Sequence, residues 1–139
     1  MIATACGGDA SGAGDSRASD SNSSGASSTG VGGPNGVVVE VQVIDNSYRP
    51  VDLVVSAGTE VVFINKGRNE HNILPDDVAN DAELSERLAS DPSTWGVTSA
   101  DLTPGSSFSH VFLEPGEYPY YCSIHGVAGK GMFGVVVVE

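Results

Sequence analysis

The stretch YYCSIHGVAGKGM, residues 120–132, is the most informative part of this chain. It places a thiol, an imidazole and a thioether, those of Cys122, His125 and Met132, within eleven positions. The segment is rich in glycine and lies between two strand-like segments. Sulfur and imidazole are soft or borderline donors, which copper prefers and calcium and magnesium do not. The stretch therefore predicts a copper site on a short loop between two strands.

Each of the three donors also has an ordinary structural explanation. Cys122 could be a buried thiol, since free cysteine is often buried. His125 could be an exposed loop residue, and Met132 could fill the core. These explanations do not account for the concentration of all three donors in one loop, so the metal site is favoured.

A second histidine is needed to complete a blue-copper site, which uses two imidazoles, one thiolate and a long axial thioether. His71 starts a predicted strand after a turn, where ligands gather at one pole of a sandwich. His110 lies between Ser109 and Val111 in mid-strand and is expected to face solvent. Elimination therefore favours His71. Met132 is the candidate thioether, because the other methionine, Met1, lies in the N-terminal tail.

The rest of the chain indicates an all-β fold. Val39 to Val43 alternates apolar and polar residues, as a half-buried strand does. Similar short segments, separated by Gly and Pro turns, occupy residues 37–43, 51–55, 60–65, 71–74, 107–113, 118–122 and 132–138. Six or seven such strands over about 100 residues predict a Greek-key antiparallel β-sandwich spanning residues 37–139.

Residues 76–104 interrupt the strand pattern. Residues 81–90 have helix-forming composition, and Asp91-Pro92 would end the helix. Six carboxylates accompany Arg87 between residues 76 and 91. We expect a short helical insertion on the surface, attached to the sandwich through Trp95.

Residues 1–36 form a separate N-terminal segment. Its Ser/Gly/Asp/Ala composition offers little to bury and predicts a flexible linker. Ala3-Thr4-Ala5-Cys6-Gly7 resembles the remnant of a bacterial lipobox, in which Cys6 would be acylated. An incidental cysteine in a small-residue tail is the alternative. A Cys6–Cys122 disulfide is disfavoured, because each cysteine has a better separate explanation. The lipobox predicts an exported protein in the periplasm or on the outer face of the cytoplasmic membrane.

The chain is strongly acidic, with a formal net charge of -12. Repulsion by phosphates argues against nucleic-acid binding. The charge could steer the protein toward a basic redox partner, or it could serve solubility alone.

The domain resembles a plastocyanin-type cupredoxin over residues 37–139. The motifs that carry the resemblance are Asp45-Asn46-x-Tyr48-x-Pro50, Ala57-Gly58-Thr59, Phe63-x-Asn65-x-Gly67, His71-Asn72, Pro115-Gly116-x-Tyr118-x-Tyr120-Tyr121-Cys122-Ser123-x-His125 and Gly131-Met132-x-Gly134.

The resemblance implies a ligand set. His71, Cys122 and His125 would be the strong copper ligands and Met132 the axial one. Asn72 would brace the ligand loop by hydrogen bonding toward Ser123. One departure concerns residues 126–131, which make the segment between His125 and Met132 longer than in plastocyanin and could alter the axial bond. The acidic insertion also lacks a counterpart in the smallest family members.

This ligand set predicts a one-electron carrier. Four protein ligands leave no open position for a substrate, unlike catalytic metal sites, so we do not expect an enzyme. We expect a monomer that serves redox proteins such as basic cytochromes or an oxidase. The alternatives are an envelope protein for copper storage, delivery or resistance, and an adhesive β-sandwich without metal.

The sequence suggests two residues through which an electron could leave the copper site, His125 and Tyr121. His125 could reach solvent within the apolar surface of residues 126–128. Tyr121, which strand alternation places opposite Cys122, could offer a second exit or could be a packing residue.

Overall fold

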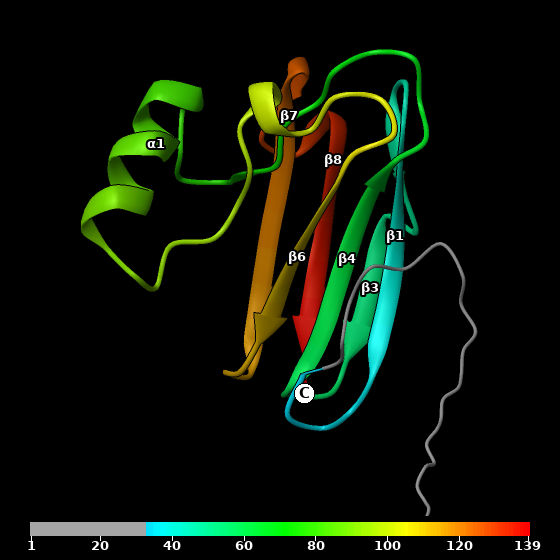
Figure 1. Ribbon diagram of the computed structural model, residues 1–139, viewed down its shortest axis with the longest axis vertical. Coiled ribbons are helices and arrows are strands. Elements are labelled where there is room, and N and C mark those ends of the chain that lie inside the picture. Colours follow the sequence, from blue (N-terminus) through cyan, green and yellow to red (C-terminus); the bar gives the residue numbers. More distant parts are fainter. Residues whose placement is uncertain (1–32) are drawn as a thin grey trace, which may run out of the picture.

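Two four-stranded sheets face each other in a sandwich (Figure 1). The computed structural model describes residues 33–139. One sheet has the order β2-β1-β4-β6 and the other β3-β8-β7-β5. The strands are β1 (Val38–Ile44), β2 (Ser47–Arg49), β3 (Asp52–Val55), β4 (Thr59–Asn65), β5 (Leu74–Pro75), β6 (Ser107–Phe112), β7 (Gly116–Val127) and β8 (Lys130–Val138). The predicted sandwich is confirmed. Cys6 and its predicted acylation lie outside the described residues.

The sheets are mixed rather than antiparallel throughout, which corrects one detail of the prediction. Strand β1 pairs in parallel with β4, and β3 pairs in parallel with β8. A parallel pair needs a long crossover in place of a tight turn. Residues 45–58 supply one, because the chain passes through β2 and then through β3 of the opposite sheet before it returns as β4. The remaining ladders are antiparallel.

Aromatic rings fill the space between the sheets. The ring of Tyr120 packs edge-on against Tyr48, with centroids 4.7 Å apart, and against Phe63 at 5.5 Å. All three side chains are fully buried. Valines of β1, β4 and β8 surround these rings, as expected for β-branched residues on a pleated surface.

The predicted helical insertion is present and covers one edge of the sandwich (Figure 1). Helix α1 (Asp81–Ser90) begins at Asn80, whose Oδ1 accepts a hydrogen bond from the Glu83 amide at 2.8 Å. Arg87 forms an ion pair with Glu83 one turn earlier in the helix and another with Asp77, which precedes the helix. After Asp91 the chain passes through Trp95 into the short 3-10 helix η2 (Ser99–Asp101).

Trp95 attaches the insertion to the core, as predicted. It is 7% exposed, and its ring meets those of Phe112 at 5.2 Å and Tyr120 at 5.8 Å. On the inner face of the helix, Leu84 packs with Leu74, Val78 and Tyr121 in a second small cluster. Apolar contacts at both points hold the insertion against the sheet edge.

The prediction that His110 faces solvent is wrong. Its imidazole is half-buried, with its centroid 4.6 Å from the ring of Phe112 and 5.8 Å from that of Trp95. Burial lowers the pKa of His110, which favours the neutral ring. The strand pattern could not show this, because the covering residue comes from the insertion.

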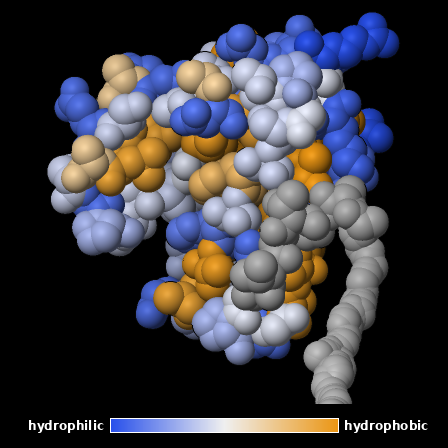
Figure 2. All heavy atoms as spheres, viewed as in Figure 1, coloured by the Kyte–Doolittle hydropathy of each residue, from blue (hydrophilic) through white to orange (hydrophobic). Residues whose placement is uncertain are grey.

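The surface is mixed in the view of Figure 2, with hydrophobic areas between the helix and the sandwich and at the lower end of the sandwich. Exposed carboxylates of the insertion include Asp76, Asp77, Glu86 and Asp91. Within residues 33–139, no helix is long and apolar enough to cross a membrane.

Replacing Trp95 tests the attachment of the insertion. Trp95→Ala should lower the free energy of unfolding by about 3–5 kcal/mol, because it opens a large cavity among packed rings. Leu88→Ala is the matched control, since Leu88 is an apolar residue of the same insertion but is 41% exposed. It should change stability by roughly 0.5 kcal/mol or less. Equal losses in chemical denaturation of the two variants would contradict the assigned role of Trp95.

Candidate metal centre

An irregularity between β7 and β8 creates the centre. The two strands pair regularly up to Tyr121 opposite Phe133, and pairing resumes at Gly126 opposite Gly131. Between these points the four residues Cys122 to His125 on β7 face the single residue Met132 on β8. Such a bulge bends its strand and redirects side chains. It therefore gathers three of the predicted donors at one end of the sandwich.

The segment from residue 126 to 131 is a β-hairpin rather than an open loop. Gly126 pairs with Gly131 and Val127 with Lys130, so the chain turns at Ala128-Gly129. A Cβ on Gly126 would lie 2.5 Å from the Met132 nitrogen, which explains why glycine is required there. Because this hairpin closes on itself, its extra length does not carry Met132 away from His125.

His71 comes from the other side of the centre, in the connection between β4 and β5. Its amide donates to the carbonyl of Leu102 at 3.2 Å, and its side chain is fully buried. Two residues later, the amide of Ile73 donates to the carbonyl of Val97 at 2.9 Å. The insertion thus fixes the backbone that carries this histidine.

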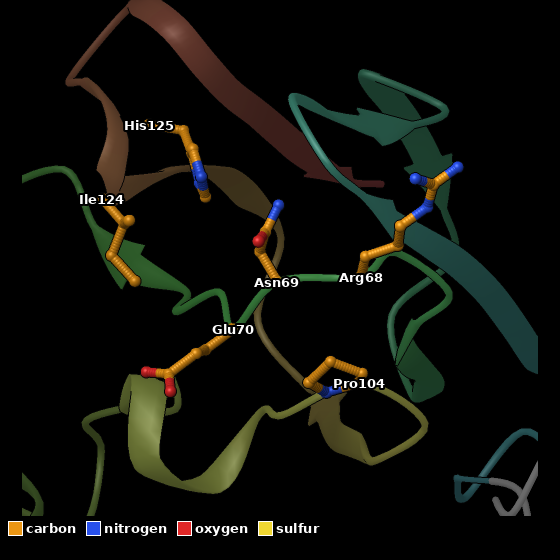
Figure 3. Close-up of a pocket in the computed structure, with 6 residues that line it drawn as sticks. All are labelled: Arg68, Asn69, Glu70, Pro104, Ile124 and His125. Carbon is orange, nitrogen blue, oxygen red and sulfur yellow. The ribbon is translucent and has the colours of Figure 1, made fainter.

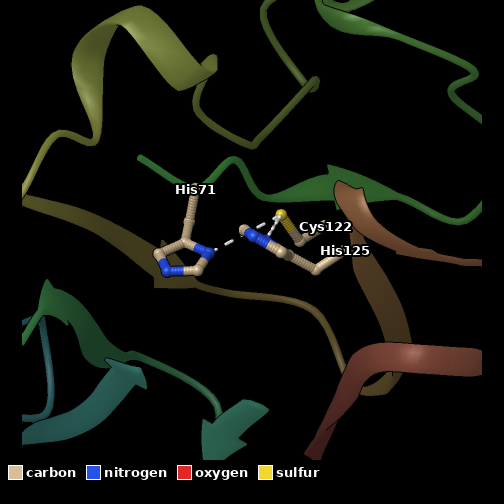
Figure 4. A group of neighbouring side chains, drawn as sticks. All are labelled: His71, Cys122 and His125. Carbon is tan, nitrogen blue, oxygen red and sulfur yellow. Dashed lines mark hydrogen bonds between the residues drawn. The ribbon is translucent and has the colours of Figure 1, made fainter. Parts of the chain in front are cut away.

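The donor atoms of His71, Cys122 and His125 converge (Figure 4). The Cys122 Sγ lies 3.8 Å from Nδ1 of His71 and 3.7 Å from Nδ1 of His125. Zinc, a borderline divalent ion, binds nitrogen at about 2.1 Å and thiolate sulfur at about 2.3 Å. If the nitrogen–metal–sulfur angle is the roughly 120° of a trigonal site, the nitrogen and sulfur atoms lie about 3.8 Å apart. The observed separations fit a trigonal metal site.

Burial prepares these donors to bind a metal. Removal from water lowers the pKa of His71, and the nearby His125 lowers it further, while Asp45 opposes both effects. The lowered pKa favours the neutral imidazole, which is the form that binds a metal. The Cys122 side chain is fully buried beside it. Met132 is also fully buried and belongs to the same apolar core as Cys122.

Asn72 links the two chain segments that carry the ligands, the one with His71 and the one with Cys122 and His125. Its Oδ1 accepts a hydrogen bond from the Ser123 amide at 2.9 Å, and its Nδ2 donates to the Ser123 hydroxyl at 2.9 Å. The predicted contact between Asn72 and Ser123 is therefore present. In addition, the Tyr48 hydroxyl donates to the Asn72 carbonyl at 2.7 Å.

Sequence reasoning missed Asp81, which extends this link into the insertion. The Asn72 Nδ2 also donates to Asp81 Oδ1 at 2.9 Å. The other carboxylate oxygen of Asp81 accepts from the Ser99 hydroxyl at 2.6 Å and from its amide at 3.2 Å. An acidic residue in a first helical turn is common and gave no signal of this contact.

The structure contradicts a surface exit at Tyr121. As expected from strand alternation, Tyr121 and Cys122 belong to different clusters. However, the insertion covers the Tyr121 ring, which is 6% exposed, and its hydroxyl donates to the Val78 carbonyl. The packing alternative is the one observed.

His125 lies at the surface of the centre. Its half-exposed ring borders a hollow of about 470 Å³ (Figure 3). The hollow is lined by Arg68, Asn69, Glu70, Pro104, Ile124 and His125. Ile124 and Val127 are 49% and 57% exposed, so apolar surface flanks the histidine.

Comparisons with known proteins agree with this geometry. Residues 36–139 match the family of copper binding proteins described as the plastocyanin/azurin family. A chloroplastic plastocyanin of Physcomitrium patens is 35% identical over 94 residues, which cover 66% of this chain and 50% of that relative. The plastocyanin of Rumex obtusifolius is 32% identical over 111 residues, which cover 78% of this chain and 96% of that protein.

A solved structure supports the same assignment. A purple cupredoxin from Nitrosopumilus maritimus is 27% identical, with a TM-score of 0.53 and coverage of 73% of this chain and 99% of that one. The chain belongs to the plastocyanin/azurin family of copper-binding proteins. Copper is its cofactor, and His71, Cys122, His125 and Met132 are positioned as type 1 copper ligands.

Asn72→Ala tests the link between the two chain segments that carry the ligands. The change leaves the Ser123 amide without its acceptor, and because this bond is only partly buried its loss should cost about 1 kcal/mol. Loss of such outer contacts typically weakens metal binding by about 10–100-fold. Ser123→Ala is the control, because it removes only the hydroxyl contact and keeps the amide bond to Asn72. Competition titrations with a copper chelator should show the larger loss in Asn72→Ala; equal affinities would contradict the bracing role.

Proposed function

We propose that this protein is a type 1 copper electron carrier. The observation that carries the proposal is the convergence of one buried thiol and two imidazole nitrogens at separations that fit a trigonal site. His71, Cys122 and His125 would hold the copper in the trigonal plane, and Met132 would supply the weak axial thioether. Copper bound in this way supplies reversible one-electron chemistry between its +1 and +2 states.

The chain's own residues keep the ligand geometry constant during electron transfer. His71 and the Cys122–His125 segment come from separate strand connections, and the Asn72 side chain joins them. The fully buried Met132 and the surrounding core exclude water from the inner side. A constrained ligand set of this kind favours rapid electron transfer over substrate turnover.

The number of donors argues against catalysis at this centre. Catalytic metal sites keep a position open for water or substrate, whereas four protein donors would occupy all positions here. We therefore propose a carrier and not an enzyme.

His125 is the proposed exit for the electron. Its ring is half-exposed beside the hollow of Figure 3, and the exposed apolar residues Ile124 and Val127 lie within two positions of it in the chain. An apolar surface of this kind suits brief docking of a redox protein. Given the net charge of -12, we propose basic redox proteins, such as cytochromes or an oxidase, as partners of a monomeric carrier.

A location in the cell envelope belongs to the same proposal and rests on the lipobox-like residues 3–7. Mass spectrometry of the protein expressed with its native leader should find acyl chains on Cys6. An unmodified Cys6 thiol would contradict the anchor but not the copper site.

Copper loading tests the function directly. One Cu(II) per chain should produce an intense blue or purple thiolate-to-copper absorption band, which ascorbate bleaches and ferricyanide restores. Cys122→Ala should lose this band, because the thiolate is its source. Binding of several colourless copper ions would instead favour storage or delivery, and no binding would favour a sandwich without metal.

A further inference from the structure

The outer nitrogen of His71 has no hydrogen-bond partner among the described residues. Nδ1 of this imidazole faces the Cys122 sulfur, and Nε2 is buried on the opposite side of the ring. A buried polar atom without a partner is destabilising and calls for an explanation. In metal sites, a ligating histidine usually donates its second N–H to a carboxylate, a carbonyl or water.

The nearest charged group is the Asp45 carboxylate. Its Oδ1 lies 3.9 Å from His71 Nε2. This oxygen also accepts the backbone amides of Arg68 at 2.6 Å and Asn69 at 3.3 Å. Both amides donate to the carboxylate and so stabilise its ionised form.

The backbone of the neighbouring turn is shaped to admit this carboxylate. A Cβ on Gly67 would lie 2.4 Å from Asp45 Oδ1 and 3.0 Å from the Asp45 amide. A larger residue at position 67 would therefore push the Asp45 carboxylate out of the 66–69 turn. The same turn is held by Asn65, whose Oδ1 accepts the Gly67 amide at 2.9 Å.

We infer that Asp45 is a positioning residue that acts on the copper through His71. The negative carboxylate attracts the Nε2–H of His71, orients the ring, strengthens Nδ1 as a donor and stabilises Cu(II) relative to Cu(I). It thereby lowers the reduction potential of the centre. The inference rests on the proposed function.

The gap of 3.9 Å is longer than a direct hydrogen bond, so the interaction described is an electrostatic attraction. The Asp45 side chain is 37% exposed. This exposure lets solvent screen its charge. We therefore expect the change in copper affinity to lie at the lower end of the roughly 10–100-fold range that is typical when a contact to a metal ligand is lost.

Asp45→Asn separates this role from a purely structural one. Asparagine keeps an oxygen that can accept the Arg68 and Asn69 amides, so the turn should persist. The negative charge is lost. The ratio of Cu(II) to Cu(I) affinity should fall about tenfold, which corresponds to a rise in reduction potential of about 59 mV for a one-electron couple.

Glu70→Gln is the matched control. Glu70 directly precedes His71 and is exposed, and Figure 3 shows its carboxylate directed away from His125. This variant removes the same charge without touching Nε2, so the affinity ratio should change less than about twofold. An equal rise in potential in both variants, or no rise in either, would overturn the inference.

A measurement on the wild-type chain does not depend on a variant folding. In the Zn(II)-loaded protein, proton NMR should show a slowly exchanging Nε2–H of His71 with a nuclear Overhauser effect to the Asp45 β protons. Absence of that effect would also overturn the inference. Failure of the proposed function has a different signature, because wild-type protein would then form no coloured copper complex.

Discussion

The site depends on one constraint, the bulge that sets Cys122–His125 against Met132 between β7 and β8. Regular pairing on both sides of the bulge fixes its ends, at Tyr121 with Phe133 and at Gly126 with Gly131. An ordinary hairpin in the same place would alternate its side chains between the two faces of the sheet. The bulge instead turns a thiol and an imidazole toward the same point, and the sandwich holds them there.

The acidic insertion is a structural part of this centre and not only a surface addition. Trp95 anchors it in the core, and Asp81 reaches Asn72, which in turn holds the amide of Ser123. It also covers Tyr121 and so closes one of the two predicted exits. The electron route that we propose is therefore left with His125 and the apolar surface around it.

The strands, the end of the helix and the kind of metal site could be predicted from the sequence, because each depends on a local pattern of residues. Valine-rich alternation indicated the strands, and Asp91-Pro92 marked the helix end. The donor types and their spacing indicated the metal. What could not be predicted were contacts between segments far apart in the chain. The parallel pairs, the burial of His110 and Tyr121, and the positions of Asp45 and Asp81 all depend on which segments meet in space.

The hairpin at 126–131 illustrates the difference. From the sequence, its length suggested that the axial bond of Met132 to copper could be altered. In the structure, glycines at 126 and 131 let its strands approach closely, and the added residues extend away from the centre. The added length therefore did not separate the backbone of Met132 from that of His125.

X-ray absorption spectroscopy of the copper-loaded protein in both oxidation states tests the central claim of a rigid, pre-formed centre most directly. A rigid centre should show one sulfur and two nitrogen ligands at nearly unchanged distances in Cu(I) and Cu(II). A first shell dominated by oxygen, or the loss of a nitrogen ligand on reduction, would contradict it.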